Sequence, residues 1–197
     1  MNTLKSFATL ILAMMFFALS GALRASDISE YAETLAKQPA PRVGQEYYLR
    51  NCLWQENGIH DATNYTRGEM VPVNTKITLE GYIDNTIWIR INSTGAIVRI
   101  LNVAKYTKKK LHAIARNMLS PSEITFDGIS KELAEAIQGG EMKPGMTKQQ
   151  VLMARGWPPA HKTRSLDEDT WVYWPSRFVQ QTIVFKDGKL TGGRGIR

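Results

Sequence analysis

Residues 144–156 read Pro-Gly-Met-Thr-Lys-Gln-Gln-Val-Leu-Met-Ala-Arg-Gly, and Trp157-Pro158-Pro159 follow directly. This stretch predicts a short helix with marked ends, because Thr147 can cap its start and Gln150 can complete a capping box. Gly156 supplies a stop, and the two prolines prevent the helix from continuing. The stretch carries no nucleophile, metal-ligand set or phosphate loop, so we interpret it as a helix that positions its neighbours.

The residues around this helix predict an α+β unit. Residues 130–137 form a second amphipathic helix that ends at Gly139-Gly140. Strands are expected at 171–174 and 178–185. Asp187-Gly188 has the residue types of a type I′ hairpin turn before a last strand from Lys189. The most economical packing lays the two helices across one face of a three-stranded antiparallel sheet.

The preceding part of the chain has the pattern of strands. Residues 46–54 are rich in aromatics without a breaker, and hydrophobic residues alternate along 76–82, 86–91 and 96–103. About five short strands separated by turns predict a small antiparallel β-barrel or sandwich, similar to a Src-homology-3 module. Its aromatic residues could pack in the core and rim or could bind a peptide or cell-wall polymer, and the sequence leaves both open.

A helix is also predicted at 106–119, with an apolar stripe and with Lys108, Lys109 and Lys110 in its first turn. Cations are unfavourable there because they face the positive end of the helix dipole. These lysines either form a solvated cap or contact an anionic phospholipid. The net charge of +7 is too diffuse for a nucleic-acid-binding domain, so no nucleic-acid partner is expected.

The N-terminus has the pattern of a secretory signal peptide. Lys5 precedes an apolar run over 8–19, and small residues follow at Ser20, Ala22 and Ala25. The run is shorter than the ~20 residues of a membrane-spanning helix, which favours cleavage over a retained anchor. Cys52 lies far from this segment and has no partner cysteine, so we expect a periplasmic protein that is not a lipoprotein.

These patterns together predict an α+β chain with five segments. They are a signal peptide at 1–25, a short helix and proline linker at 26–41, a barrel-like domain at 42–104, a connecting helix at 105–120 and an α+β domain at 121–197.

The reactive residue types do not form a recognisable catalytic set. His60, His112 and His161 lie in different predicted elements without metal-ligand spacing. No nucleophile elbow or cysteine–histidine pair is evident, and the acidic run 167–169 lacks the spacing of a calcium loop. We therefore expect no catalytic residues, no cofactor and no bound metal.

Several of these features together resemble one domain family. Gly145-Met146-Thr147-Lys148-Gln149-Gln150-Val151, the Gly156-Trp157-Pro158 turn, Trp171-x-Tyr173 and Phe185-x-Asp187-Gly188-Lys189 are similar to the SmpA/OmlA (BamE-like) domain family, over residues 144–190. The resemblance implies a helix-helix-three-strand fold, which is also related to the repeat of β-lactamase inhibitor proteins. It further implies a non-catalytic envelope protein that takes part in outer-membrane protein assembly. The family's best-known member is a lipoprotein and lacks the strand-rich segment found here.

The leading expectation is therefore a periplasmic interaction protein at the inner face of the outer membrane. An enzyme inhibitor of the β-lactamase-inhibitor-like fold and a peptidoglycan- or peptide-binding module are the alternatives. Aromatic and arginine side chains dominate binding hot spots. The predicted contact residues are Trp157, Pro158, Pro159, His161, Arg164, Trp171, Tyr173, Trp174 and Arg177.

Overall fold

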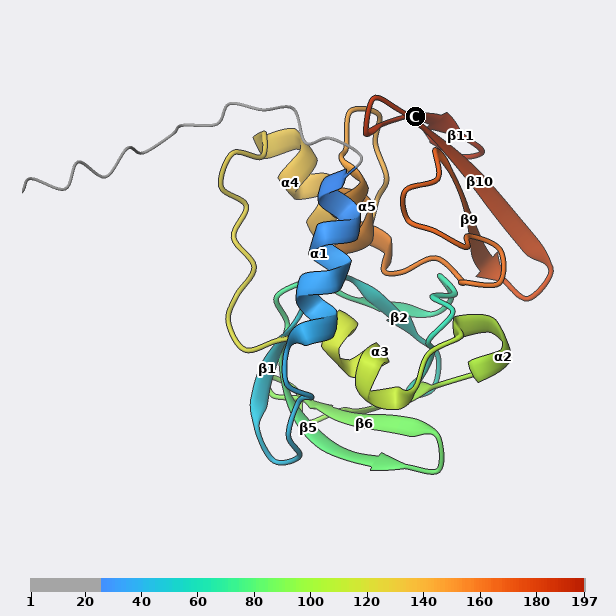
Figure 1. The fold of residues 1–197 in the computed structure, drawn as a ribbon. Helices are drawn as coiled ribbons and strands as arrows, with labels where there is room; N and C mark the ends of the chain where they lie inside the picture. The colour runs from blue at the N-terminus through green and yellow to red at the C-terminus, as the bar shows by residue number, and fades with distance from the viewer. Residues whose placement is uncertain (1–25, 197) are drawn as a thin grey trace, which may run out of the picture.

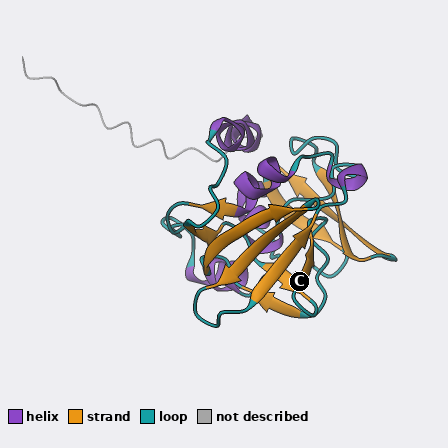
Figure 2. Ribbon diagram, turned by 90° about the horizontal axis from the view of Figure 1, so that it is seen from below, coloured by secondary structure: helices purple, strands orange, loops and turns teal. Residues whose placement is uncertain are grey.

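The largest element of the structure is a six-stranded sheet that curls into half of a barrel (Figure 2). The computed structural model describes residues 26–196, so the predicted signal peptide lies outside the described residues. In spatial order the strands are β3 (Ile59–Asp61), β7 (Ile97–Leu101), β6 (Thr86–Ile91), β5 (Lys76–Ile83), β1 (Glu46–Leu49) and β8 (Leu119–Ser120). A separate antiparallel pair joins β2 (Leu53–Gln55) to β4 (Glu69–Val71).

The alternation predicted for the central strands is confirmed. Successive side chains of a strand point to opposite faces of the sheet, so every second residue of β5, β6 and β7 faces the core. These inward residues are almost completely buried: Ile77, Leu79, Ile87, Ile89, Val98 and Ile100. Asp84 and Asn85 both have positive φ, as a tight turn between β5 and β6 requires.

The prediction of a wholly antiparallel barrel is wrong, because β3 pairs with β7 in parallel and the sheet stays open at β3 and β8. The single strand expected over 46–54 is also divided into β1 and β2. The chain leaves the sheet where Arg50 and Asn51 are buried. The Cys52 amide then donates to the carbonyl of Met153, in the other half of the molecule, at 2.9 Å.

The helix predicted at 106–119 is interrupted at the lysine run. Helix α2 (Ala104–Thr107) ends at Lys108, whose φ of 54° is left-handed, and α3 (Leu111–Met118) begins only after Lys110. Asn102 explains the break, since its Nδ2 donates to the carbonyl of Lys109 at 3.0 Å and its Oδ1 accepts from Thr107 at 2.6 Å. The lysines therefore precede α3 instead of occupying its first turn, and α3 packs on the sheet through its predicted stripe.

The C-terminal half has the predicted arrangement of two helices and three strands. Helices α4 (Lys131–Gln138) and α5 (Lys148–Arg155) share one core with the antiparallel sheet of β9 (Thr170–Ser176), β10 (Val179–Lys186) and β11 (Lys189–Gly193). The capping box of α5 is confirmed by bonds of 2.8 and 3.1 Å between Thr147 and Gln150. The turn at Asp187 and Gly188 has positive φ at both residues, as a type I′ turn requires.

The two halves pack against each other. Cys52 and Val73, from the strand-rich half, belong to the core beneath the three-stranded sheet. Helix α1 (Ser26–Lys37) runs along both halves (Figure 1), because Ile28 enters that same core while the helix also contacts α3. The chain thus builds a single body in which each half completes the other.

Candidate interaction surface

Four half-buried aromatic rings from separate segments meet at the junction of the two halves. Trp174 of β9 lies edge-on to His161 and Tyr106, with ring centroids 4.5 and 5.2 Å away, and Tyr65 lies 6.4 Å from Trp174. Backbone bonds hold the segments together, since the His161 amide donates to the carbonyl of Tyr106 and the Thr66 amide donates to the carbonyl of Pro175. We call Tyr65, Tyr106, His161 and Trp174 the aromatic cluster.

Cationic side chains border the aromatic cluster. The Lys105 ammonium lies 4.8 Å from the Tyr106 ring centroid, and Lys108 and Arg177 are exposed nearby. Burial lowers the pKa of His161, and the positive charges of Lys162 and Lys108 lower it further, although the hydrogen bond with the Tyr106 backbone opposes them. The surface is therefore electropositive, with a neutral imidazole at its centre.

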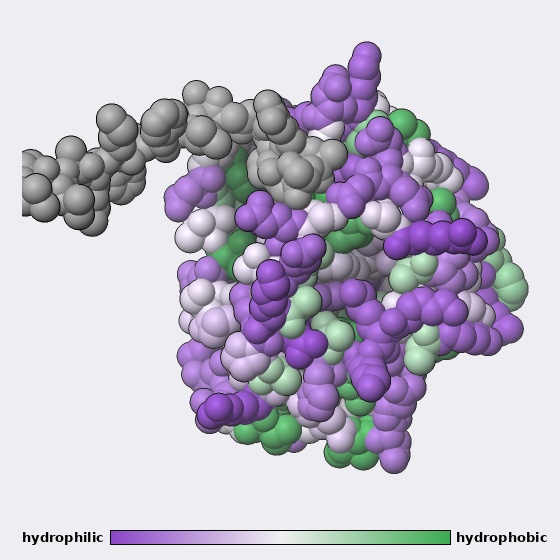
Figure 3. Space-filling view, viewed as in Figure 1, coloured by the Kyte–Doolittle hydropathy of each residue, from purple (hydrophilic) through white to green (hydrophobic). Residues whose placement is uncertain are grey.

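The turn between β9 and β10 exposes an unusual amount of hydrophobic surface. Phe178 is 89% exposed at its tip, and the Arg177 guanidinium lies 5.5 Å from its ring. Among residues 26–196, three of the five exposed large hydrophobic side chains, Phe178, Val179 and Val184, belong to this hairpin. Elsewhere, the face shown in Figure 3 carries hydrophobic residues only as small patches among hydrophilic ones. We call the aromatic cluster with Lys105, Lys108, Arg177 and Phe178 the aromatic–cation surface.

The predicted contact residues are divided between this surface and the interior. His161, Trp174 and Arg177 lie on the surface, and Arg164 is exposed on the loop before β9. Trp171 and Tyr173 are 0% and 1% exposed, because alternate residues of β9 face the core, so neither side chain is available to a partner.

The turn after α5 also lies largely inside the molecule. Pro158 and Pro159 are buried between the halves, and Trp157 is half-buried with the Lys109 ammonium 4.8 Å from its ring centroid. Burial, together with the charge of Arg116, lowers the pKa of Lys109. Lys109 is therefore engaged within the protein, whereas Lys108 and Lys110 are exposed.

Tyr106, Lys105 and Phe178 are absent from the predicted contact residues, and Tyr65 is predicted only as one of the aromatic residues of the strand-rich half. Tyr65, Tyr106 and Lys105 join the surface through contacts between distant segments, which leave no local pattern in the sequence. Phe178 is the first residue of the strand predicted at 178–185, so the sequence pattern places it in that strand. The structure starts β10 at Val179, which leaves Phe178 in the turn.

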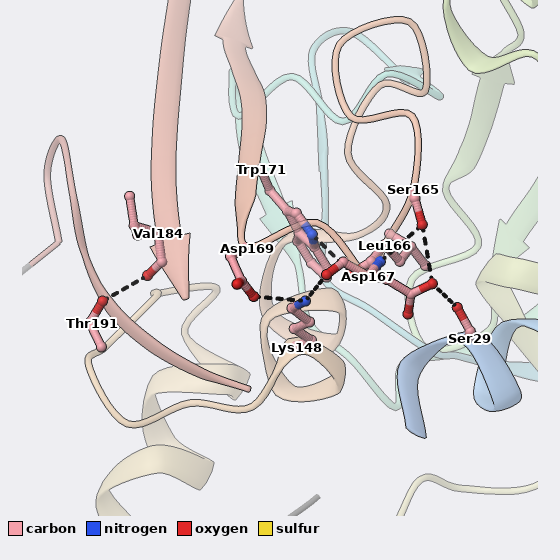
Figure 4. Close-up of polar contacts among 9 residues, drawn as sticks. All are labelled: Ser29, Lys148, Ser165, Leu166, Asp167, Asp169, Trp171, Val184 and Thr191. Atoms are coloured by element: carbon pink, nitrogen blue, oxygen red, sulfur yellow. Dashed lines mark hydrogen bonds and ion pairs between the residues drawn. The ribbon is translucent and has the colours of Figure 1, made fainter. Parts of the chain in front are cut away.

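Lys148 organises a polar cluster on the other side of the C-terminal sheet (Figure 4). Its ammonium donates to the carbonyl of Asp167 at 2.8 Å and lies 3.6 Å from the carboxylate of Asp169. Asp167 also accepts a hydrogen bond from Ser29 of α1. The acidic run 167–169 thus holds a lysine and fastens α1 to the C-terminal half. Within residues 26–196 no group of His, Cys, Asp or Glu side chains is arranged to hold a metal ion.

His60 forms a buried polar contact at the junction. Its Nδ1 lies 2.8 Å from the carbonyl oxygen of Trp54, and its Nε2 lies 3.2 Å from Oδ1 of Asn64. The orientation of the Asn64 amide is set by its Nδ2, which donates to the carbonyl of Trp157 at 2.7 Å. Burial lowers the pKa of His60 to about 4, so the ring is neutral at pH 7 and donates from one of its two nitrogens to the oxygen that faces it.

This burial predicts that acid destabilises the protein. The pKa of His60 is about 4 when folded and 6.5 ordinarily, so the unfolded chain takes up the proton first as the pH falls. The contribution of the neutral His60 ring to the stability of the fold is complete above about pH 6.5, and it is lost as the pH falls toward 4. Urea unfolding should give a free energy lower by about 2 kcal/mol at about pH 5 than at about pH 7.

A matched pair of histidine variants identifies the group responsible. His60→Gln should remove most of this pH dependence, although it also lowers the stability at every pH. His112→Gln should keep the dependence, because His112 is exposed and lies edge-on to Tyr82. Greater stability at low pH would instead mean that the buried ring is charged, with both nitrogens donating to the oxygens that face them.

Comparison with protein families, with characterised proteins and with solved structures found no match to this chain. No helix in the described part of the chain combines the length and apolar character needed to cross a membrane. The aromatic–cation surface is therefore interpreted from its own chemistry.

Proposed function

We propose that the protein is a non-catalytic, periplasmic interaction protein that binds an envelope protein partner at the outer membrane, in the manner of an outer-membrane protein assembly factor. The observation that carries the proposal is the aromatic–cation surface, with Phe178 89% exposed beside Arg177. A partner that covers such a side chain removes apolar surface from water, which favours binding. Partly exposed aromatic and arginine residues are the types that contribute most to protein–protein binding.

The topology supports the same assignment. The order α4, α5, β9, β10, β11 is the helix-helix-three-strand order that the sequence resemblance of residues 144–190 to the SmpA/OmlA (BamE-like) domain implies. The signal-peptide pattern at 1–25 supports export to the periplasm. The strand-rich half, proposed to be similar to a Src-homology-3 module, is an addition to this domain. It supports the domain by contributing Cys52 and Val73 to its core.

An anionic phospholipid is a second component of this proposal. Residues 104–118 contain five lysine and arginine residues and no acidic residue, and Lys105, Lys108 and Lys110 are exposed. Each basic residue near an anionic membrane adds about 1 kcal/mol of attraction. Lys109 contributes less because it packs on Trp157.

The proposal predicts that partner binding depends on the tip of the β9–β10 turn. Phe178→Ser should strongly reduce the recovery of partner proteins copurified at native expression from detergent-solubilised envelopes. The fold should be unaffected, because Phe178 contributes little to the core. Ile83→Ser is the matched control, since Ile83 is a 52% exposed hydrophobic residue at the tip of the β5–β6 hairpin.

The lipid component is tested separately by sedimentation with vesicles of phosphatidylglycerol or of phosphatidylcholine. Lys108→Gln combined with Lys110→Gln should reduce binding to the anionic vesicles alone. Equal recovery of every protein with Phe178→Ser, Ile83→Ser and the native chain would contradict the proposal.

The exposed turn also favours one alternative, a periplasmic enzyme inhibitor of the β-lactamase-inhibitor-like fold. A projecting turn with Arg177 and Phe178 at its tip has the form of an element that enters an enzyme cleft. This alternative predicts saturable inhibition of one envelope hydrolase that Phe178→Ser abolishes. Inhibition of none in a panel of purified envelope hydrolases would exclude it.

A further inference from the structure

A cavity of about 340 Å³ opens beside the aromatic cluster, between the β2–β3 hairpin and the β9–β10 turn. Both halves of the molecule therefore contribute to its walls. The Thr66 amide donates to the carbonyl of Pro175 at 3.0 Å, and Arg155 contacts the Thr66 hydroxyl at 3.4 Å, so the two walls are fixed relative to each other. Cavities of this size at the junction of two units are the usual places for small-molecule binding.

One charged pair in the cavity is internally satisfied. The Arg67 guanidinium lies 2.9 Å from the Glu56 carboxylate, so these two charges neutralise each other. Asp61 and Arg177 also line the cavity, and neither makes an ion pair or a side-chain hydrogen bond with the residues that the structure describes. The cavity thus offers one negative and one positive group to a ligand.

Tyr65 also lines the cavity and is close enough to both unpaired groups to respond to their charges. Burial raises the pKa of its hydroxyl, the Asp61 carboxylate raises it further, and the Arg177 guanidinium lowers it. The two charges therefore both act on the same phenol. Asp61 is itself half-buried, and burial raises its pKa while the Arg67 charge lowers it. A cation bound beside Asp61 would restore the interaction that burial removes.

The aromatic walls of the cavity are held in place. Arg155 lies 5.1 Å from the Trp54 ring centroid. Gly140 also abuts the Trp54 ring, since a Cβ at this position would lie only 2.6 Å from it. A fixed ring reduces the ordering cost of binding and provides an apolar surface next to Tyr65.

We propose that this cavity binds a small zwitterionic ligand of the amino-acid or dipeptide class. Its ammonium group pairs with Asp61, its carboxylate pairs with Arg177, and its side chain packs on Trp54 and Tyr65. A ligand with charge of only one sign would leave the opposite group of the cavity desolvated without a partner, which is unfavourable. Arginine suits the carboxylate because its guanidinium can donate two parallel hydrogen bonds. This inference does not depend on the proposed function.

The test uses alanyl-phenylalanine and two blocked forms of it, one N-acetylated and one C-amidated, in isothermal titration with the full chain. The native protein should bind the unblocked dipeptide about tenfold or more tightly than either blocked form, because each block removes one charge-assisted contact. Asp61→Asn should abolish the discrimination against the N-acetylated form alone. Arg177→Gln should abolish the discrimination against the C-amidated form alone.

Matched variants control for non-specific effects of charge and folding. Asp127→Asn and Arg42→Gln remove exposed charges outside the cavity and should leave both discriminations intact. Thermal melts show whether each variant is folded, and the indole NMR signal of Trp54 should shift with the unblocked dipeptide even where the heat of binding is small. Phe178→Ser should keep dipeptide binding while losing partner capture, which separates this inference from the proposed function.

Four results would overturn the inference. One is equal affinity for the unblocked and blocked dipeptides. Another is the loss of both discriminations in each single variant. The third is the absence of saturable binding up to about 10 mM, a concentration beyond that expected for a specific small-ligand site. The fourth is binding of the neutral disaccharide N,N′-diacetylchitobiose in place of the dipeptide, which would assign the cavity to a glycan.

Discussion

Replacement of Trp171 by alanine should lower the free energy of unfolding by about 4 kcal/mol. Trp171 is fully buried under helices α4 and α5, and its ring centroid lies 4.8 Å from that of Phe185. Its Nε1 also donates to the carbonyl of Leu166 at 3.2 Å. The substitution removes the largest side chain of the C-terminal core and leaves a cavity. Urea unfolding followed by circular dichroism measures the change.

Trp88→Ala is the matched control, because Trp88 lies half-buried on the outer face of β6 with Arg99 5.7 Å from its ring. The Trp88→Ala substitution should lower the free energy of unfolding by about 1 kcal/mol, which is the size of a cross-strand contact. Trp171→Phe should recover part of the stability by refilling the core. Similar losses for Trp88→Ala and Trp171→Ala would contradict the placement of Trp171 in the core.

Gly156→Ala should destabilise the protein by about 3 kcal/mol. Gly156 ends α5 with φ of 74° and ψ of −172°, a combination that residues with a Cβ strongly disfavour. The added Cβ would also lie only 2.7 Å from the side chain of Asn64. Displacement of Asn64 would disturb its bonds to His60 and Trp157 and thereby loosen the junction of the halves.

Gly95→Ala is the matched control for a positive φ without a steric contact. Gly95 has the same φ of 74°, but a Cβ at this position would meet nothing within 4 Å. Its replacement should therefore cost only about 1 kcal/mol. Chemical unfolding of both variants measures the difference, and equal losses would contradict the added cost expected at Gly156.

The sequence predicted the elements that depend on neighbouring residues. The capping box of Thr147 and Gln150, the turn at Asp187-Gly188 and the alternation in β5 and β6 are all confirmed. Each involves residues close in the chain, so a short window contains the physical cause. The packing of both C-terminal helices on one sheet face also followed, because five short elements have few economical arrangements.

The features that escaped prediction depend on distant residues. The helical period of 106–119 is real, but Asn102 competes for the backbone at Lys109 and breaks the helix. The parallel pairing of β3 with β7 joins Ile59 to Arg99, which no local pattern indicates.

The candidate site shows the same division between local and distant causes. The sequence identified aromatic and arginine residues around β9, yet it could not tell inward Trp171 from outward Trp174 without the register of the strand. The aromatic cluster itself is assembled from four segments, so its membership required the fold.

The sharing of one core by both halves constrains the order of events during synthesis. Ile28, Cys52 and Val73 complete the hydrophobic layer beneath β9, β10 and β11, which are the last strands made. Chains grow from the N-terminus, so these side chains emerge long before the sheet that covers them exists. The apolar side chains of the strand-rich half therefore stay uncovered until the C-terminal strands have been made. During this interval the chain is prone to aggregation, and a chaperone that covers the exposed surface would protect it.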